Sequence, residues 1–223
     1  MKIQITSDNS HTLFSTKAGQ TYHSAEGAIM ESKHVYISPA FNHFQDKPII
    51  KILEIGFGTG LNAILTLLEA ENTNKTIFYE TLEPDPIAVS IYTKLNYPSN
   101  LSCDKDLFLK LHQVEPEQTI NLPHFHFVKK YIKVADYISD QFFDVIYFDA
   151  FSPDAQPEMW TTNIFHKMYK LLSPNGILLT YSAKGIVKNA LREAGFQIKR
   201  LPGAGSKHHM LKAEKILPIN SPT

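Results

Sequence analysis

Three alternating glycines directly after an apolar run constrain this chain more than any other feature. Residues 49–55 are rich in isoleucine and leucine, and Gly56, Gly58 and Gly60 follow them. Such a β-branched run predicts a buried strand, and the helix-like pattern from Leu61 predicts a helix immediately after the glycines. Glycine adopts backbone angles that a Cβ forbids and lets a ligand approach the main chain. The segment therefore predicts a strand, a sharp turn and a helix around a nucleotide-like cofactor.

The spacing of these glycines distinguishes between cofactors. A dinucleotide fingerprint requires its third glycine three positions after the second, whereas Gly60 follows Gly58 by two positions and Leu61 comes next. This spacing argues against NAD or FAD. With Glu54 in front, the pattern E-x-G-x-G-x-G resembles motif I of class I methyltransferases, which use S-adenosylmethionine (SAM). The alternative interpretation is a glycine-rich turn in an ordinary α/β domain.

Length and composition predict one α/β domain with a small elaboration. The 223 residues are enough to bury most of the apolar surface of such a domain. No apolar run approaches the ~18 residues that span a bilayer, the N-terminus lacks a signal-peptide pattern, and Cys103 is the only cysteine. We therefore expect a cytoplasmic protein without disulfides or a membrane partner. Lysine and arginine balance aspartate and glutamate at 22 each, so any nucleic acid must bind a local basic patch.

The order of elements from residue 48 onward predicts a parallel sheet with helices on both faces. Seven strands are expected, at residues 49–55, 76–82, 125–128, 143–148, 176–181, 196–201 and 208–213. Helices are expected at residues 62–70, 86–95, 104–114, 134–138, 160–171 and 185–194. The last two strands should form a hairpin through a turn at 202–205, which makes the final strand antiparallel. This is the Rossmann-like architecture of class I methyltransferases.

Residues 1–47 predict an extension in front of this core. Two short apolar-rich runs flank a polar turn at residues 7–10, which is typical of a β-hairpin. A helix should follow, with Ser24 as its N-cap. We therefore expect a hairpin and helix extension at 1–47, a methyltransferase domain at 48–217 and a tail at 218–223.

Polar residues at the ends of the predicted strands are the candidate site. Ligands of an open α/β sheet collect beyond the carboxyl ends of the strands, where the strand order reverses. Glu83 follows the second strand and is placed to accept both ribose hydroxyls of an adenosine cofactor, with Asp85 as its competitor. Asp149 ends a nearly apolar strand, and it either holds the amino group of the cofactor or accepts a proton or hydrogen bond from the acceptor. Phe151 suggests a wall for a planar ring, and Trp160 either lines the same pocket or anchors a helix in the core.

The histidines do not predict a metal centre. His124 and His126 alternate in a strand-like run, and His208 and His209 are adjacent. Neither pair is joined to cysteines or carboxylates with the spacing of metal ligands. We therefore predict no metal.

Two segments near Asp149 carry a resemblance to a known family. Residues 144–153 read DVIYFDAFSP and residues 157–161 read PEMWT. They resemble the methyltransferase half of MnmC, the bifunctional bacterial tRNA-modifying enzyme, whose counterpart reads D-G-F-A-P and then N-P-D-M-W-T. The resemblance extends over most of the chain. The sequence departs from the family at Ala150, where the family has glycine, and at residues 130–131, where Lys-Tyr replaces Gly-Asp, so we name no adenine-binding residue there.

The resemblance implies transfer of a methyl group from SAM to the exocyclic amine of 5-aminomethyl(-2-thio)uridine at the tRNA wobble position. It implies a stand-alone enzyme that binds the tRNA anticodon loop and works with a separate FAD oxidase or other upstream tRNA-modifying enzymes. Asp149 would be catalytic. The residues expected to bind SAM are Glu54, Gly56, Gly58, Gly60, Asn62 and Glu83. Those expected to bind the substrate are Phe151, Tyr22, Ser24 and Lys207.

Two other functions stay open from the sequence. An aminopropyltransferase of the spermidine synthase type has a related fold, a similar glycine loop and an aspartate after the fourth strand. It would use decarboxylated SAM and a polyamine. A non-catalytic binding module with the same fold would bind SAM or tRNA without turnover.

Overall fold

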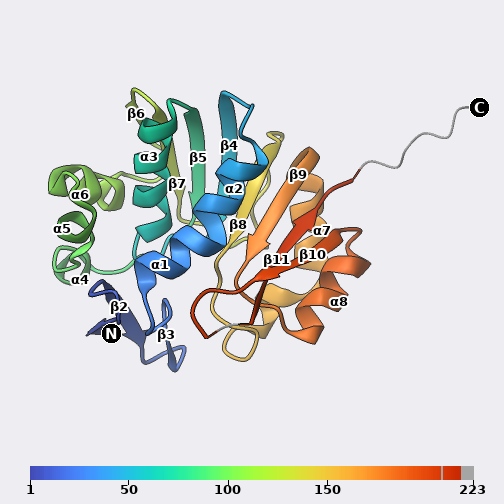
Figure 1. Ribbon diagram of the computed structural model, residues 1–223, viewed down its shortest axis with the longest axis horizontal. Coiled ribbons are helices and arrows are strands. Elements are labelled where there is room, and N and C mark those ends of the chain that lie inside the picture. Colours follow the sequence, from blue (N-terminus) through green and yellow to red (C-terminus); the bar gives the residue numbers. More distant parts are fainter. Residues whose placement is uncertain (207, 217–223) are drawn as a thin grey trace, which may run out of the picture.

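The computed structural model describes residues 1–206 and 208–216, so Lys207 and the predicted tail at 218–223 lie outside the described residues. A mixed sheet of eight strands forms the centre of the described part, in the order β10-β11-β9-β8-β4-β5-β7-β6 (Figure 1). The strands are β4 (Ile49–Ile55), β5 (Thr76–Leu82), β6 (Thr119–Leu122), β7 (Phe125–Lys130), β8 (Phe143–Phe148), β9 (Leu172–Thr180), β10 (Gln197–Pro202) and β11 (His209–Glu214). The predicted α/β class and antiparallel last strand are confirmed, because β11 pairs antiparallel with both β9 and β10.

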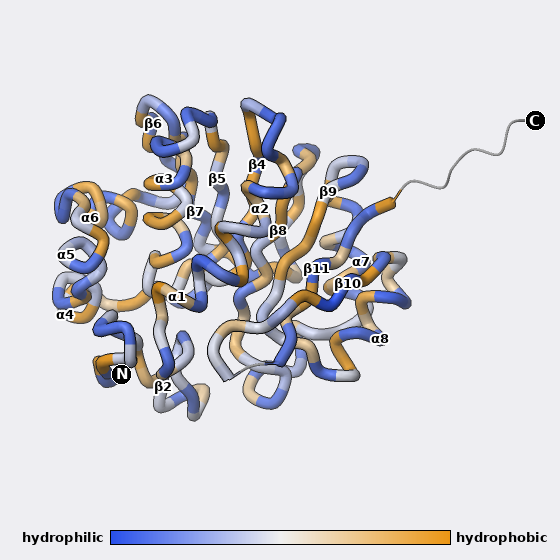
Figure 2. The backbone as a smooth tube through the Cα atoms, viewed as in Figure 1, coloured by the Kyte–Doolittle hydropathy of each residue, from blue (hydrophilic) through white to orange (hydrophobic). Residues whose placement is uncertain are grey.

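Helices cover both faces of this sheet. The strands carry apolar stretches, as Figure 2 shows for β4 and β9. Side chains alternate along a strand, so Ile52 packs into one hydrophobic cluster and its neighbour Leu53 into the other. The first cluster is covered by α1 (Ala28–Ser32), the π-helix η1 (Lys33–Ile37), α2 (Ser38–His43), α3 (Leu61–Thr73) and α6 (Lys105–Gln113). The second is covered by α7 (Thr162–Leu171) and α8 (Gly185–Glu193).

Some predicted elements were wrong. The sheet has an eighth strand that the sequence did not reveal, since β6 is only four residues long and pairs antiparallel with β7 at the edge. The helix expected at 86–95 is reduced to α4 (Val89–Tyr92), because Ala88 is extended, and α5 (Tyr97–Leu101) follows. The helix expected at 134–138 is a turn, and the ammonium group of Lys167 donates to two of its carbonyl groups. The helix expected from residue 160 begins at Thr162, after the 3₁₀ turn η2 (Pro157–Trp160).

The N-terminal extension is a small sheet followed by a long helical segment. The predicted hairpin is confirmed as β1 (Lys2–Ile5) and β2 (His11–Ser15), and β3 (Gln20–Thr21) adds a third strand. The prediction of Ser24 as an N-cap was wrong, because the helix begins at Ala28 and the Ser24 hydroxyl instead accepts a hydrogen bond from Glu26 N–H. Helices α1, η1 and α2 then run across one face of the sheet, as the blue ribbon in Figure 1. Across 1–206 and 208–216, no helix has the length and apolar character needed to cross a membrane.

Candidate active site

A cavity of about 1110 Å³ opens at the carboxyl edge of the sheet. Its walls include residues that follow β4, β5 and β8, and β4 lies between the other two strands. Further parts of the wall come from the N-terminal extension, from residues 132–135 after β7, from the loop after Asp149 with η2 and α7, and from Tyr181 after β9. The cavity therefore lies where ligands bind in open α/β sheets, and segments far apart in the sequence surround it.

The glycine loop needs its glycines for two different reasons. All three have positive φ, at 92° for Gly56, 49° for Gly58 and 74° for Gly60. A Cβ on Gly56 would lie 2.9 Å from the carbonyl oxygen of Asp149, and one on Gly58 would lie 3.0 Å from the ring of Tyr22. These two glycines line the cavity, whereas Gly60 does not. Instead, a Cβ on Gly60 would lie 2.9 Å from the buried His112 ring, so this glycine serves packing behind the loop.

Glu83 is held at the cavity wall by the main chain. Its two carboxylate oxygens accept hydrogen bonds from Gly58 N–H and Asp85 N–H, each at 2.9 Å. Burial raises the pKa of Glu83, and the two backbone N–H groups oppose that shift. The competitor Asp85 is exposed, and its side chain pairs with Lys17 at 3.2 Å. Geometry therefore favours Glu83 over Asp85 as the carboxylate that faces a cofactor.

Glu54 does not reach the cavity. It is completely buried beside the glycine loop, and its carboxylate accepts a hydrogen bond from the Thr81 hydroxyl at 2.7 Å. Burial raises the pKa of Glu54 to about 8. Because the side chain does not contribute to the cavity wall, its position supports the loop from behind.

Asp149 is fixed between the glycine loop and the N-terminal extension. One carboxylate oxygen accepts from the Tyr36 hydroxyl at 2.7 Å, and the other accepts from the Asn62 side-chain amide at 2.8 Å. Asn62 belongs to the first turn of α3, next to the glycine loop, while Tyr36 belongs to η1 of the extension. Burial raises the pKa of Tyr36 well above its usual value, so this phenol stays protonated and donates to the carboxylate. The Asp149 carboxylate is thereby oriented within the cavity.

An aromatic pair forms the wall beside Asp149. The rings of Phe151 and Tyr22 are 4.9 Å apart and meet edge to face, and both line the cavity. Ser24 lines it too, whereas Trp160 does not. Trp160 is buried, packs against Phe148 and donates from its indole N–H to the carbonyl oxygen of Phe151. Of its two predicted roles, the structure shows the core role, and the tryptophan supports the loop that presents Phe151.

The structure thus brings together most of the residues predicted from the sequence. Those that line the cavity are Gly56, Gly58, Asn62, Glu83, Asp149, Phe151, Tyr22 and Ser24. Glu54 and Gly60 lie behind the loop, and Lys207 is outside the described residues. Glu31 and Tyr36 also line the cavity, although no sequence pattern predicted them. One sequence signal could have indicated Glu31, because it is an acidic residue on the buried face of a helix.

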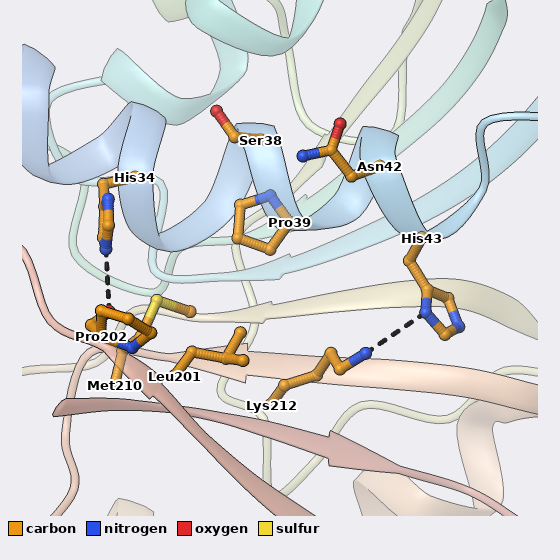
Figure 3. Close-up of a pocket in the computed structure, with 9 residues that line it drawn as sticks. All are labelled: His34, Ser38, Pro39, Asn42, His43, Leu201, Pro202, Met210 and Lys212. Carbon is orange, nitrogen blue, oxygen red and sulfur yellow. Dashed lines mark hydrogen bonds between the residues drawn. The ribbon is translucent and has the colours of Figure 1, made fainter.

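A second, smaller hollow lies on the other side of the helical segment. It measures about 440 Å³ and runs between η1–α2 and the β10–β11 hairpin (Figure 3). His34 donates to the carbonyl oxygen of Pro202 at 2.8 Å, and Lys212 donates to His43 Nδ1 at 3.4 Å. None of the described residues predicted to bind SAM or substrate lines this hollow. The larger cavity is therefore the candidate active site.

The residues of the larger cavity fit the cofactor SAM. Gly56 and Gly58 provide main chain that a ligand can approach, and the second lone pairs of the Glu83 carboxylate suit ribose hydroxyls. Asn62 is buried, and its Oδ1 atom has no hydrogen-bond partner among the described residues. A buried acceptor of this kind normally has a donor, and the ammonium group of the methionine part of SAM is one.

Comparisons with known proteins agree with this geometry. A family model described as S-adenosyl-L-methionine-dependent methyltransferase matches residues 104–216. The bifunctional protein MnmC of Azoarcus sp. is 27% identical over 218 residues, which cover 90% of this chain and 34% of that protein. MnmC of Legionella pneumophila (strain Lens) is 29% identical over 233 residues, with coverages of 90% and 34%. The chain thus spans about a third of the length of these relatives, and the predicted resemblance to MnmC is confirmed.

Solved structures support the fold. MnmC2 from Aquifex aeolicus superposes with a TM-score of 0.79 at 22% identity and covers 100% of this chain and 72% of that one. Spermidine synthase from Thermotoga maritima superposes with a TM-score of 0.55 at 17% identity, with coverages of 98% and 74%. At these identities both likenesses concern the fold alone. The family model covers half of the chain, and the protein therefore belongs to the S-adenosyl-L-methionine-dependent methyltransferases.

Proposed function

We propose that this enzyme transfers a methyl group from SAM to the exocyclic amine of 5-aminomethyl(-2-thio)uridine at the wobble position of tRNA. The relatives are named for the biosynthesis of 5-methylaminomethyl-2-thiouridine in tRNA, which supports this acceptor. The observation that carries the proposal is Asp149, an oriented carboxylate between the glycine loop and an aromatic wall. The carboxylate suits the amine of such an acceptor, and the aromatic wall suits its flat ring.

The chemistry of the acceptor explains what Asp149 would do. An alkylamine has a pKa of about 10 and is mostly protonated at neutral pH, so it must lose a proton before its lone pair can react. When bound, SAM supplies an electrophilic methyl group on a sulfonium. The Asp149 carboxylate accepts an N–H of the amine and stabilises the cation that methylation forms. Binding both reactants in one cavity would hold the amine close to the methyl group in the right orientation.

Phe151 and Tyr22 would receive the base. A wobble uridine in an anticodon loop can be turned out and stacked on an aromatic side chain. Both rings line the cavity next to Asp149, and Ser24 is available for hydrogen bonds to the acceptor. In this arrangement the extension at 1–47 forms part of the acceptor site, and the segment at 48–217 binds the cofactor. Lys207 stays a proposed contact with the substrate.

The acceptor amine must be made before this enzyme acts. We place the protein in the cytoplasm with its tRNA substrate, downstream of a separate FAD oxidase or another tRNA-modifying enzyme. The binding of the anticodon loop must rely on local basic residues, because the chain carries no net charge.

A direct test uses SAM and tRNA that lacks the final methyl group. After incubation, the tRNA is digested and the nucleosides are identified by mass spectrometry. We expect one methyl group on 5-aminomethyluridine or its 2-thio form. Asp154→Asn is the matched control for Asp149→Asn. Asp154 is exposed and pairs with Lys184, so this variant should keep full activity. Unmethylated tRNA would refute the proposal, and an aminopropyl product from putrescine and decarboxylated SAM would support the spermidine synthase alternative.

A further inference from the structure

A second carboxylate of the cavity, Glu31, has no role in the function described so far. It belongs to α1 of the extension, it is only 6% exposed, and it lines the same cavity as Asp149. Its Oε2 atom accepts a hydrogen bond from Ser24 N–H at 2.7 Å, which fixes its side chain against the loop that enters the cavity. Burying a polar side chain costs free energy unless it is hydrogen-bonded, so the position of Glu31 at the wall of this cavity calls for an explanation.

The helix that carries Glu31 has an unusual geometry at this point. Directly after Ser32 the α-helix widens into the π-helix η1, which bears Tyr36. Single π-helical turns occur often at functional sites. Here the turn lets Glu31, Ser32 and Tyr36 all contribute to the cavity wall. Tyr36 donates a hydrogen bond to Asp149 directly, and Glu31, Tyr36 and Asp149 all line the same cavity, so both carboxylates are available to one ligand.

Asp149 alone satisfies only part of a primary amine. Each of its oxygens already accepts one strong hydrogen bond, from Tyr36 and from Asn62. A neutral primary amine has two N–H groups and one lone pair, and the lone pair reacts only if it points at the methyl group. Two acceptors on different walls fix both N–H groups and thereby the direction of the lone pair. Two acidic side chains at this cavity, Glu31 and Asp149, also suit a cationic acceptor and product.

We propose that Glu31 is a second acceptor-binding carboxylate, which holds one N–H of the amine while Asp149 holds the other. This inference rests on the proposed function. The ammonium form of the acceptor gives one proton to water in the open cavity. The nitrogen lone pair then forms the N–C bond while the C–S bond breaks and its electron pair stays on sulfur. The product is a secondary ammonium ion, which both carboxylates stabilise, and a neutral thioether.

The test is the isosteric variant Glu31→Gln, measured as methyl transfer at saturating SAM and tRNA. We expect kcat to fall about ten- to a hundredfold, the usual cost of losing a charge-assisted hydrogen bond to a reacting group. The dissociation constant of SAM and the melting temperature should stay close to wild type, because Glu31 lies on the acceptor side. Glu31→Asp, which withdraws the carboxylate but keeps its charge, should retain more activity than Glu31→Gln.

Glu80→Gln is the matched control, since Glu80 is similarly buried but pairs with Lys130 away from the cavity. It should keep the wild-type kcat. The inference is overturned if Glu31→Gln keeps kcat within about threefold of wild type, or if SAM affinity falls in proportion to kcat, since general structural damage would then explain the loss. A wild-type enzyme that leaves aminomethyluridine unmethylated would instead refute the proposed function itself, and the role of Glu31 with it.

Discussion

The two halves of the cavity are built in different ways. The half proposed to bind SAM, the donor half, consists mainly of main chain from one short segment, the glycine loop, with Glu83 held by the N–H groups of Gly58 and Asp85. The half proposed to bind the acceptor, the acceptor half, consists of side chains from three distant parts of the chain. Tyr22 and Tyr36 come from the extension, Phe151 follows β8, and Tyr181 follows β9.

This contrast indicates which half of the cavity tolerates amino-acid substitutions. A loop that presents main chain to a cofactor depends chiefly on a few glycines, so we expect the donor half to tolerate little change at these positions. Side chains from separate segments can vary one at a time, so the acceptor half can select a substrate. Asp149 joins the two halves, since it accepts hydrogen bonds from Asn62 of the donor half and Tyr36 of the acceptor half.

The largest expected effect comes from the residue that joins the halves. Asp149→Asn should lower kcat about 10²- to 10⁴-fold, the range for a group that acts on a proton at the reacting atom. The affinity for SAM should change by less than about threefold, because the main-chain contacts of the loop remain. Single-turnover methylation and calorimetric SAM binding measure the two quantities. An equal loss of both would assign Asp149 to the donor half.

The donor half should be most sensitive to an added Cβ. Gly58→Ala forces a side chain to within 3.0 Å of the Tyr22 ring at a φ of 49°, so we expect SAM to bind about tenfold more weakly or worse, equivalent to ~1.4 kcal/mol. Gly19→Ala is the control. Gly19 also has positive φ, at 67°, but its added Cβ would meet no heavy atom of the described structure within 4 Å.

The control isolates contact from backbone strain. Both variants place alanine in the left-handed region, which costs ~1–2 kcal/mol of stability. Only Gly58→Ala should weaken SAM binding, measured by calorimetry at a temperature where both variants are folded. Equal losses in the two variants would mean that strain alone accounts for the effect.

The same contrast decides how much the sequence could predict. The glycine loop, the strand before it and Glu83 follow local rules of periodicity and spacing, and each was found in its predicted place. Glu31 and Tyr36 were missed, because their position at the cavity depends on the packing of α1 and η1 across the sheet, a long-range contact that periodicity does not reveal. The extra strand β6 was missed for the opposite reason, since four residues carry too little pattern.

Glu54 is the motif residue whose position in the structure favours a cofactor contact least. The pattern E-x-G-x-G-x-G groups this glutamate with the loop and predicts a contact with the cofactor. Strand residues alternate between faces, however, and burial here places the carboxylate against Thr81 and not at the cavity wall. Spacing identified the motif, but the direction of a side chain at the end of a strand depends on the sheet around it.

The smallest expected effect is therefore that of Glu54→Gln. SAM affinity should stay within about twofold of wild type, the reverse of what the motif predicts, because the amide can still accept the hydrogen bond from Thr81. The pH dependence of folding stability should differ between the variant and wild type. Burial raises the pKa of Glu54 to about 8 from an ordinary 4.5, so the folded state holds a proton that the unfolded state releases, and wild-type stability falls as the pH rises toward 8.

Glu54→Gln removes this contribution, so its melting temperature should decline less than that of wild type between pH 6.5 and pH 8. Glu83, whose pKa is also raised by burial, remains in the variant and leaves part of the slope. Each kcal/mol of difference in the free energy of unfolding corresponds to a shift of about 2–4 °C in the melting temperature of a chain of this size. Parallel pH profiles for wild type and variant would show that Glu54 is ionised in the folded state, and a large loss of SAM affinity would return it to the donor half.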